Sequence, residues 1–132
     1  MKTKLTRYAL FHSLEKVANR LSEHRNCNAP NFKYPVASAS LTAFAAFYFQ
    51  HPSLLCHEET LAQKNYYDNF LKLFHRQPVI SSQSLRNILD PVDPQSFIPA
   101  FDDAFNRLDR SGLLGQLVFD QKMGLLFSGD GV

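Results

Sequence analysis

Five side chains in the middle of the chain have the chemistry that contacts nucleic acid. Lys72 and Arg76 can hold backbone phosphates, and Arg86 can contact a phosphate or the edge of guanine. Gln83 and Asn87 carry amides, which pair well with adenine. The spacing of Gln83, Arg86 and Asn87 places all three on one helix face. The same pattern is also typical of an ordinary solvated face, and the spacing alone favours that interpretation.

These residues belong to a segment, residues 66–89, whose pattern resembles a helix-turn-helix. A helix is predicted over Tyr66–His75, a turn over Arg76–Ile80, and a second short helix over Ser81–Leu89. The apolar face of the second helix consists of Leu85, Ile88 and Leu89. If this face packs inward, the polar face points outward. Helical hairpins with polar outer faces are common, so this pattern has low specificity for DNA.

A second feature is Asp130, which follows an apolar run and has glycine on both sides. Carboxylates at strand ends hold metal ions in many phosphoryl-transfer enzymes, and glycines let metal and substrate approach closely. A Gly-Asp-Gly sequence is equally an ordinary turn. One carboxylate makes no catalytic site, and the sequence contains no nucleophile elbow, phosphate-binding glycine loop or His-Glu-x-x-His motif.

Histidine and cysteine are arranged in ways that raise the question of zinc. The two groups are His24 with Cys27, and His51 with Cys56 and His57. Their spacing matches no familiar zinc finger, and two thiols are few for a structural zinc site. Ordinary surface histidines and reduced thiols are the favoured interpretation.

The elements that would carry these residues are predicted to be mainly helical. Residues 1–25 form an N-terminal helix over Thr6–His24, and residues 26–36 form an Asn- and Pro-rich loop. This loop is the predicted hinge, since the first helix could pack independently. Residues 37–112 form the helical domain, which begins with a central apolar helix over Ala37–Gln50.

Two further helices are predicted within this domain. One begins at Ser53 and runs through Leu61. The other covers Phe97–Arg110, ends at Gly112, and carries a clear stripe of apolar residues: Phe97, Phe101, Ala104, Phe105 and Leu108.

After Gly112 the pattern changes to short apolar runs. Gln116–Asp120 and Met123–Ser128 are predicted to form a β-hairpin. Two strands alone make a marginal sheet, so residues 113–132 are interpreted as the start of a sheet that is otherwise missing.

The composition is that of a soluble globular protein, with 45% hydrophobic and 20% charged residues. Residues 1–89 hold 11 Lys or Arg against 5 Asp or Glu, whereas residues 90–132 hold 3 against 7. A basic front half is a weak indication of a polyanionic partner. The most apolar stretch, Val36–Phe49, is shorter than the roughly 20 residues that span a bilayer, so we expect no membrane insertion and a cytoplasmic location.

Three runs of the sequence add a resemblance to a known family. They are "FKYPVASASLTAFAAFYFQHPSLLCHEE", "NFLKLFHRQPVISSQSLRNILDPVDPQSFIPAFDDAF" and "LLFSGDGV", and together they lie within Phe32–Val132. They resemble the N-terminal part of bacterial insertion-sequence DDE transposases, in which an apolar helix, a short helix ending in "ILDPV", a phenylalanine-rich helix and a hairpin follow in this order.

The resemblance implies that Asp130 is the first of three acidic metal ligands in an RNase H-like α/β domain that binds Mg²⁺ or Mn²⁺. The other two ligands have no counterpart in these residues, so we expect this chain, ending at its first acidic ligand, to need no cofactor and to be no enzyme by itself. This family usually has Leu-Asp-Gly-Thr where this chain has Gly129-Asp130-Gly131-Val132.

The resulting expectation is a mainly α protein whose C-terminal β-hairpin is the remnant of a catalytic domain. Its expected role is that of a DNA-binding or assembly fragment of a transposase, with self-association as a further possibility. A small helical protein–protein interaction domain is the alternative. The salt dependence of DNA binding separates the two, because phosphate contacts release counterions and an apolar interface does not.

Overall fold

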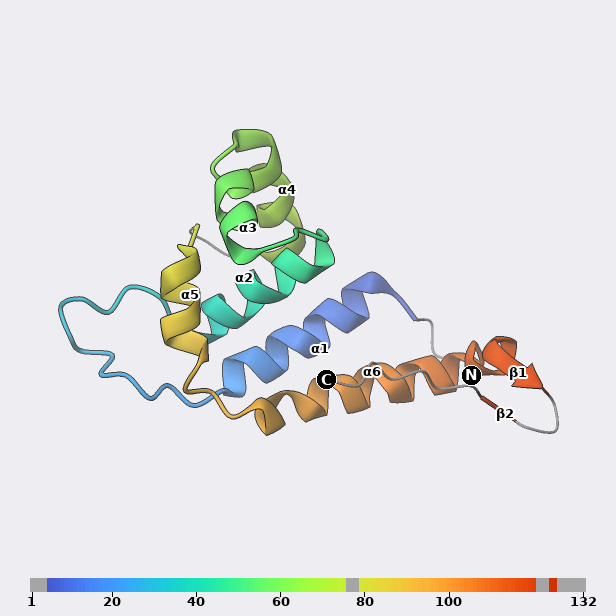
Figure 1. Cartoon of the computed structure of the whole chain (residues 1–132). Helices are drawn as coiled ribbons and strands as arrows, with labels where there is room; N and C mark the ends of the chain where they lie inside the picture. The colour runs from blue at the N-terminus through green and yellow to red at the C-terminus, as the bar shows by residue number, and fades with distance from the viewer. Residues whose placement is uncertain (1–4, 76–78, 121–123, 126–132) are drawn as a thin grey trace.

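The computed structural model describes residues 5–75, 79–120 and 124–125 of the chain. Within these residues the protein is mainly α, as the sequence predicts (Figure 1). The α-helices are α1 (Arg7–Arg20), α2 (Val36–Tyr48), α3 (Leu54–Leu61), α4 (Lys64–Phe74), α5 (Ser82–Leu89) and α6 (Ile98–Ser111). Short 3-10 helices, η1 (Pro94–Phe97) and η2 (Leu114–Leu117), precede and follow α6.

Hydroxyl side chains fix the start of three of these helices. Thr6 accepts a hydrogen bond from the backbone N–H of Ala9 at 3.2 Å, and Ser53 accepts one from Cys56 at 3.0 Å. Ser81 caps α5 in the same way. Each cap satisfies an amide that the first helical turn leaves without a partner. Gly112 ends α6 with a φ of 77°, a left-handed conformation that glycine adopts without strain.

Helix α2 is the centre of the molecule, as its apolar sequence predicts. It contacts α1, α3, α4 and α5, and Figure 1 shows it crossing between α1 on one side and the α3–α4 pair on the other. Its last turn differs from the expectation of burial all round, since Phe47 is 79% exposed. In the described part of the chain, no helix has both the length and the hydrophobicity needed to cross a membrane.

The core is divided into three clusters along α2. The largest joins the end of α1 to α5 and contains Leu21, Val36, Ala39, Ile80, Leu85, Ile88 and Val92. A second cluster fills the space between α2, α3 and α4 with Ala45, Leu61, Phe70 and Phe74. The third consists of Ala18, Ala37 and Leu41, between α1 and α2. The inner residues predicted for α5 do face the core, since Leu85 and Ile88 are buried in the first cluster and Leu89 packs against it.

The expectation that the first helix packs independently is wrong. Helix α1 packs against α2 and α6, and Val17 and Ala18 are buried. The connection after it is Asn- and Pro-rich as expected, but polar contacts of Glu23 and Arg25 fasten it to the start of α2. A loop composition rich in turn formers does not by itself indicate a hinge, because side-chain contacts can immobilise it.

The apolar stripe of α6 is covered only in part: Phe97 packs against the largest core cluster, and Ala104 and Leu108 are half-buried. Phe101 is 73% exposed and Phe105 is 48% exposed, and none of the described side chains of α6 is fully buried. The side turned toward α1 instead carries Asp103, whose carboxylate interacts with Ser13 of α1. Because successive helix residues are rotated by about 100°, this side lies well away from Phe101. Helix α6 thus lies along α1 (Figure 1) with its phenylalanines in solvent.

A short antiparallel pair follows α6, formed by β1 (Val118–Asp120) and β2 (Gly124–Leu125), with Val118 opposite Leu125. Gln116 lies in η2 and not in the first strand, contrary to the predicted start of the hairpin. Most of the predicted second strand, and Asp130, lie outside the described residues. The link between residues 113–132 and an α/β catalytic domain stays a prediction.

Candidate nucleic-acid interface

Helix α5 carries three of the five residues that the sequence predicts to contact DNA. Leu85 and Ile88 are buried against the core, and this fixes which side of α5 faces solvent. At its N-terminus the backbone N–H of Ser82 donates a 2.7 Å hydrogen bond to a carboxylate oxygen of Glu58 on α3. A negative charge at this end complements the helix dipole and holds α5 against α3.

The predicted contact residues of α5 do point outward. Gln83, Arg86 and Asn87 are all exposed. The amide nitrogen of Gln83 donates a 3.0 Å hydrogen bond to the amide oxygen of Asn87, so the two amides hold each other in place. A base or phosphate would therefore meet two oriented side chains on this face.

The two remaining predicted residues do not join this face. Lys72 is exposed on α4, whereas α5 packs mainly against α2 and α3. In Figure 1 α4 lies on the far side of α3 from α5. Arg76 lies outside the described residues. The structure therefore separates Lys72 from the face formed by Gln83, Arg86 and Asn87.

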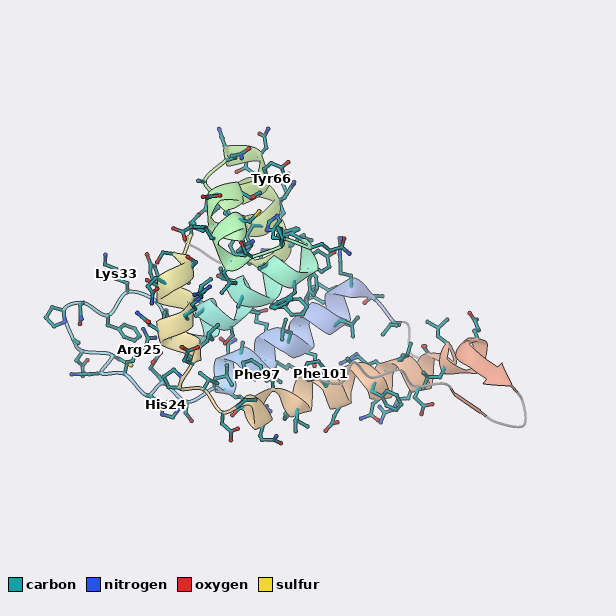
Figure 2. The ribbon with its side chains drawn as sticks, viewed as in Figure 1. His24, Arg25, Lys33, Tyr66, Phe97 and Phe101 are labelled. Carbon is teal, nitrogen blue, oxygen red and sulfur yellow. The ribbon has the colours of Figure 1, made fainter. Side chains whose placement is uncertain are left out.

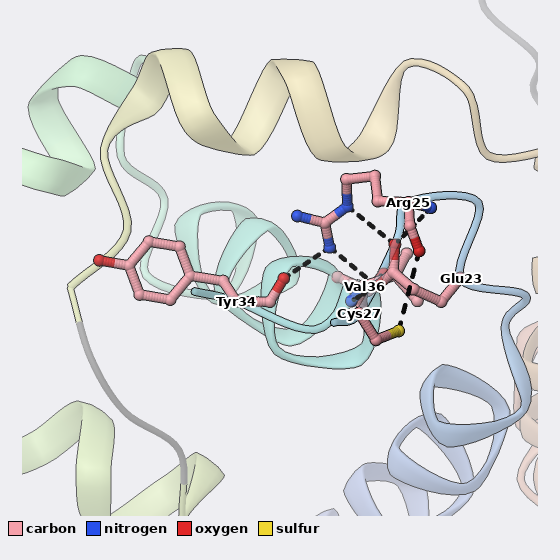
Figure 3. Close-up of polar contacts among 6 residues, drawn as sticks. Glu23, Arg25, Cys27, Tyr34 and Val36 are labelled. Carbon is pink, nitrogen blue, oxygen red and sulfur yellow. Dashed lines mark hydrogen bonds and ion pairs between the residues drawn. The ribbon is translucent and has the colours of Figure 1, made fainter. Parts of the chain in front are cut away.

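The connection between α1 and α2 is held by a network around Glu23 (Figure 3). Arg25 donates two hydrogen bonds of 2.8 Å to the Glu23 carboxylate, one from Nε and one from Nη2. Nη2 of Arg25 also donates to the backbone carbonyl of Tyr34 at 2.6 Å, and the backbone N–H of Val36 donates to Glu23 at 2.9 Å. The Arg25 guanidinium lies 4.8 Å from the centre of the Phe32 ring. This bidentate pair fixes both ends of the connection.

The same contacts perturb the acidity of Glu23. The hydrogen bonds from Arg25 are the largest cause that lowers the pKa of Glu23 below its ordinary value, and the Val36 amide adds to them. Partial burial opposes this shift. The carboxylate is thus charged at neutral pH and neutralises the Arg25 guanidinium.

A groove of about 300 Å³ runs between this connection and α5. Figure 2 shows Arg25 and Lys33 on the connection, on the side of the molecule where α5 lies. Because Arg25 is paired with Glu23, Lys33 brings the net positive charge. The groove is lined by Arg25, Asn31, Lys33, Tyr34, Ser84, Asn87 and Ile88.

Sequence reasoning identified Asn87 but not the residues on the other wall of this groove. Asn31 and Lys33 lie in the Asn- and Pro-rich loop predicted over residues 26–36, and a loop composition does not indicate a groove. The Glu-x-Arg pattern at one end of this Pro-rich loop could have indicated that the loop is fixed, because a bidentate ion pair can close such a loop.

His57 was expected at the surface but is fully buried. Its Nδ1 atom lies 2.8 Å from Nδ1 of His51, and its ring packs against Phe49 and Phe70. Burial, followed by the nearby His51, lowers the pKa of His57 to about 4, while the Thr42 backbone acts in the opposite direction. One of the two Nδ1 atoms must donate and the other accept, and the lowered pKa of His57 keeps its own ring neutral at neutral pH.

No group of three or more His, Cys, Asp or Glu residues converges as a metal site in the part of the chain that the structure describes. Asp130, the predicted metal ligand, lies outside that part.

Comparisons with known proteins provide no family assignment. No family model matches the chain, and neither the curated proteins nor the solved structures contain a significant match.

Proposed function

We propose that this chain is a DNA-binding or assembly domain of the type found in the N-terminal part of DDE transposases, acting in the cytoplasm. The observation that carries the DNA-binding part is the exposed face of α5 formed by Gln83, Arg86 and Asn87, of which Asn87 also lines the groove that holds Lys33. The assignment to transposases rests on the resemblance in sequence.

The chemistry of this face suits the outside of duplex DNA. Lys33 and Arg86 supply the positive charge that phosphates attract, and the paired amides of Gln83 and Asn87 can contact base edges. Strand transfer would need carboxylates that hold two metal ions about 4 Å apart, and Asp130 alone cannot do so. We therefore propose binding without catalysis for these residues, with Mg²⁺ or Mn²⁺ needed only by a complete DDE site.

Fluorescence anisotropy with a labelled DNA duplex tests the proposal. We expect micromolar or weaker binding that falls steeply between about 50 and 200 mM salt. Arg86→Ala and Lys33→Ala should each weaken binding several-fold and reduce the salt dependence, since each removes one phosphate contact. Lys64→Ala, an exposed cation at the start of α4, is the matched control and should change little. Equal losses in all three variants would show that only overall charge matters and would reject the α5 face.

The exposed apolar face of α6 favours a second candidate, a protein–protein interaction domain. Ile98, Phe101 and Phe105 are 44%, 73% and 48% exposed and recur at helical spacing on one side of α6. Such a face fits an apolar partner helix, including that of a second copy. Sedimentation velocity over a concentration series tests self-association, which Phe101→Asp should abolish and added salt should leave unchanged. A monomer at every concentration would reject self-association through this face.

A further inference from the structure

A second groove, of about 450 Å³, lies between the start of α1 and the end of α4 and is separate from the α5 face. Its lining combines aromatic and apolar side chains with cationic ones. The residues are Thr6, Arg7, Tyr8, Phe11, His12, Glu15, Leu41, Lys72, Leu73, Phe74 and His75.

The aromatic part of this groove is flat and accessible. Tyr8 is 77% exposed, and its ring is nearly parallel to that of His12, at an interplanar angle of 2° and a centroid distance of 6.0 Å. Deeper in the groove, Phe11 stacks on the buried Phe74 at 5.1 Å, so its ring is held in a fixed orientation. Exposure of an aromatic ring to water is unfavourable, and a ligand that covers the ring removes this cost. A flat ligand can do so by stacking on the ring.

The charged part of the groove favours an anionic ligand. Arg7 comes from α1 and Lys72 from α4, and both side chains are exposed. Glu15 is the one carboxylate in the lining. A ligand with a flat ring and a phosphate on either side satisfies both the aromatic platform and the two cations. This is the composition of unpaired nucleotides, which bind to proteins through base stacking and backbone charge.

We propose that this groove binds single-stranded nucleic acid, with an unstacked base on Tyr8 and the neighbouring phosphates near Arg7 and Lys72. Duplex DNA keeps its bases stacked inside the helix, so it cannot use Tyr8 in this way. Lys72, which the structure separates from the α5 face, thereby has a contact of its own. The proposal does not depend on duplex binding by α5, because the two grooves share no lining residue.

Anisotropy with the full chain and labelled oligonucleotides of about ten residues tests this proposal, since single-strand sites cover roughly 4–16 nucleotides. Oligo-dT and oligo-rU are compared, and binding of either sugar supports the proposal. Tyr8→Ala should weaken binding about tenfold, whereas Tyr8→Phe should keep it, because stacking requires the ring and not the hydroxyl. Lys72→Ala should weaken binding and reduce its salt dependence.

Three controls separate this site from general charge effects and from the α5 face. Phe47→Ala removes a ring that is 79% exposed but does not line the groove, and it should leave binding unchanged. An abasic oligonucleotide has phosphates without bases, so its affinity should be the same for the wild type and Tyr8→Ala. Arg86→Ala should affect duplex binding and spare oligo-dT.

Any one of three results would overturn the proposal. They are an unchanged oligo-dT affinity in Tyr8→Ala, an equal loss in Phe47→Ala, or an equal effect of Tyr8→Ala on the abasic strand. Failure of Arg86→Ala to affect duplex binding would reject the proposed function while leaving this groove unaffected.

Discussion

Glu23 and Arg25 determine the position of Lys33 although neither was singled out by its spacing in the sequence. Their bidentate pair, together with the Tyr34 carbonyl and the Val36 amide, turns a Pro-rich connection into a fixed wall of the α5 groove. The pair itself spans two residues, but its contacts with Tyr34 and Val36 span 9 and 13 residues. A helix or strand pattern does not encode such contacts.

Glu23→Gln should therefore lower stability, by about 1–2 kcal/mol at pH 7, because it removes the charge that accepts hydrogen bonds from Arg25 and Val36. The pKa of Glu23 is lowered on folding, so its contribution is present above the ordinary value of 4.5 and is lost as pH falls through the folded pKa. Urea unfolding at pH 7 and pH 3 measures both effects. The difference in unfolding free energy between wild type and Glu23→Gln should narrow at pH 3, and Glu59→Gln, at an exposed position of α3, provides a carboxylate control.

The burial of His57 predicts a second loss of folding stability in acid, at a higher pH than the loss that involves Glu23. Its folded pKa of about 4 lies below the ordinary 6.5, so the unfolded chain takes up a proton first as pH falls. The free energy of unfolding should decrease by up to about 3 kcal/mol between pH 6.5 and pH 4. Below pH 4 this histidine should contribute no further change.

Urea midpoints at pH 7 and pH 5 in His57→Leu should differ less than in the wild type. His24→Leu, which alters an exposed histidine, should retain the wild-type difference. An identical pH dependence in His57→Leu and wild type would contradict the burial of a neutral imidazole. Histidine type and spacing could not reveal this role, because burial depends on Phe49 and Phe70 closing around the ring.

At the scale of elements, the sequence predicts the existence of the helices better than their orientation. Ser53, Ser81 and Gly112 mark helix ends within a residue of where they occur, because caps act locally. Helix α6 shows the limit of this reasoning. Its stripe correctly indicates a helix, but the polar contact with α1 comes from Asp103, which interacts with Ser13. Periodicity identifies an apolar face without saying what covers it.

The orientation of α6 has a direct consequence for stability. Phe101→Ser should change the free energy of unfolding by less than about 0.5 kcal/mol, because the ring is 73% exposed. Leu85→Ala, at a fully buried position of α5, should cost about 2–5 kcal/mol. Urea unfolding of the two variants against the wild type measures the contrast. A large loss in Phe101→Ser would mean that the stripe of α6 is buried after all.

For the molecule as a whole, four cations of the basic front half predicted from the sequence are divided between two surfaces. Lys33 and Arg86 lie at the α5 face, whereas Arg7 and Lys72 lie at the α1–α4 groove. A count of charges along the chain gives the total but not this division, because it follows from how α1 and α4 meet. The helical class and the central position of α2 were predictable from composition and hydrophobic pattern, whereas the pairing of α5 with α2 and α3 was not.

The unequal burial of the helices predicts unequal stability across the molecule. Helices α1 and α2 share buried residues, among them Ala18 and Leu41, so their central amides should exchange only when the whole molecule unfolds. Helix α6 lies on α1 with no fully buried side chain among its described residues, so it should open separately and exchange faster. Hydrogen exchange followed by mass spectrometry resolves these segments.

The polar contact between α6 and α1 makes this expectation sharper. Asp103 lies between Arg107, which donates to it at 2.7 Å, and Ser13. Asp103→Asn should therefore increase exchange in α6 and leave α2 unchanged, since α6 can detach without opening the core. Asp102→Asn, at the exposed neighbouring position, is the matched control and should alter neither helix. Equal protection of α6 and α2 in the wild type would show instead that the six helices unfold as one unit, with the phenylalanine face of α6 covered in solution, as it would be in a dimer formed through that face.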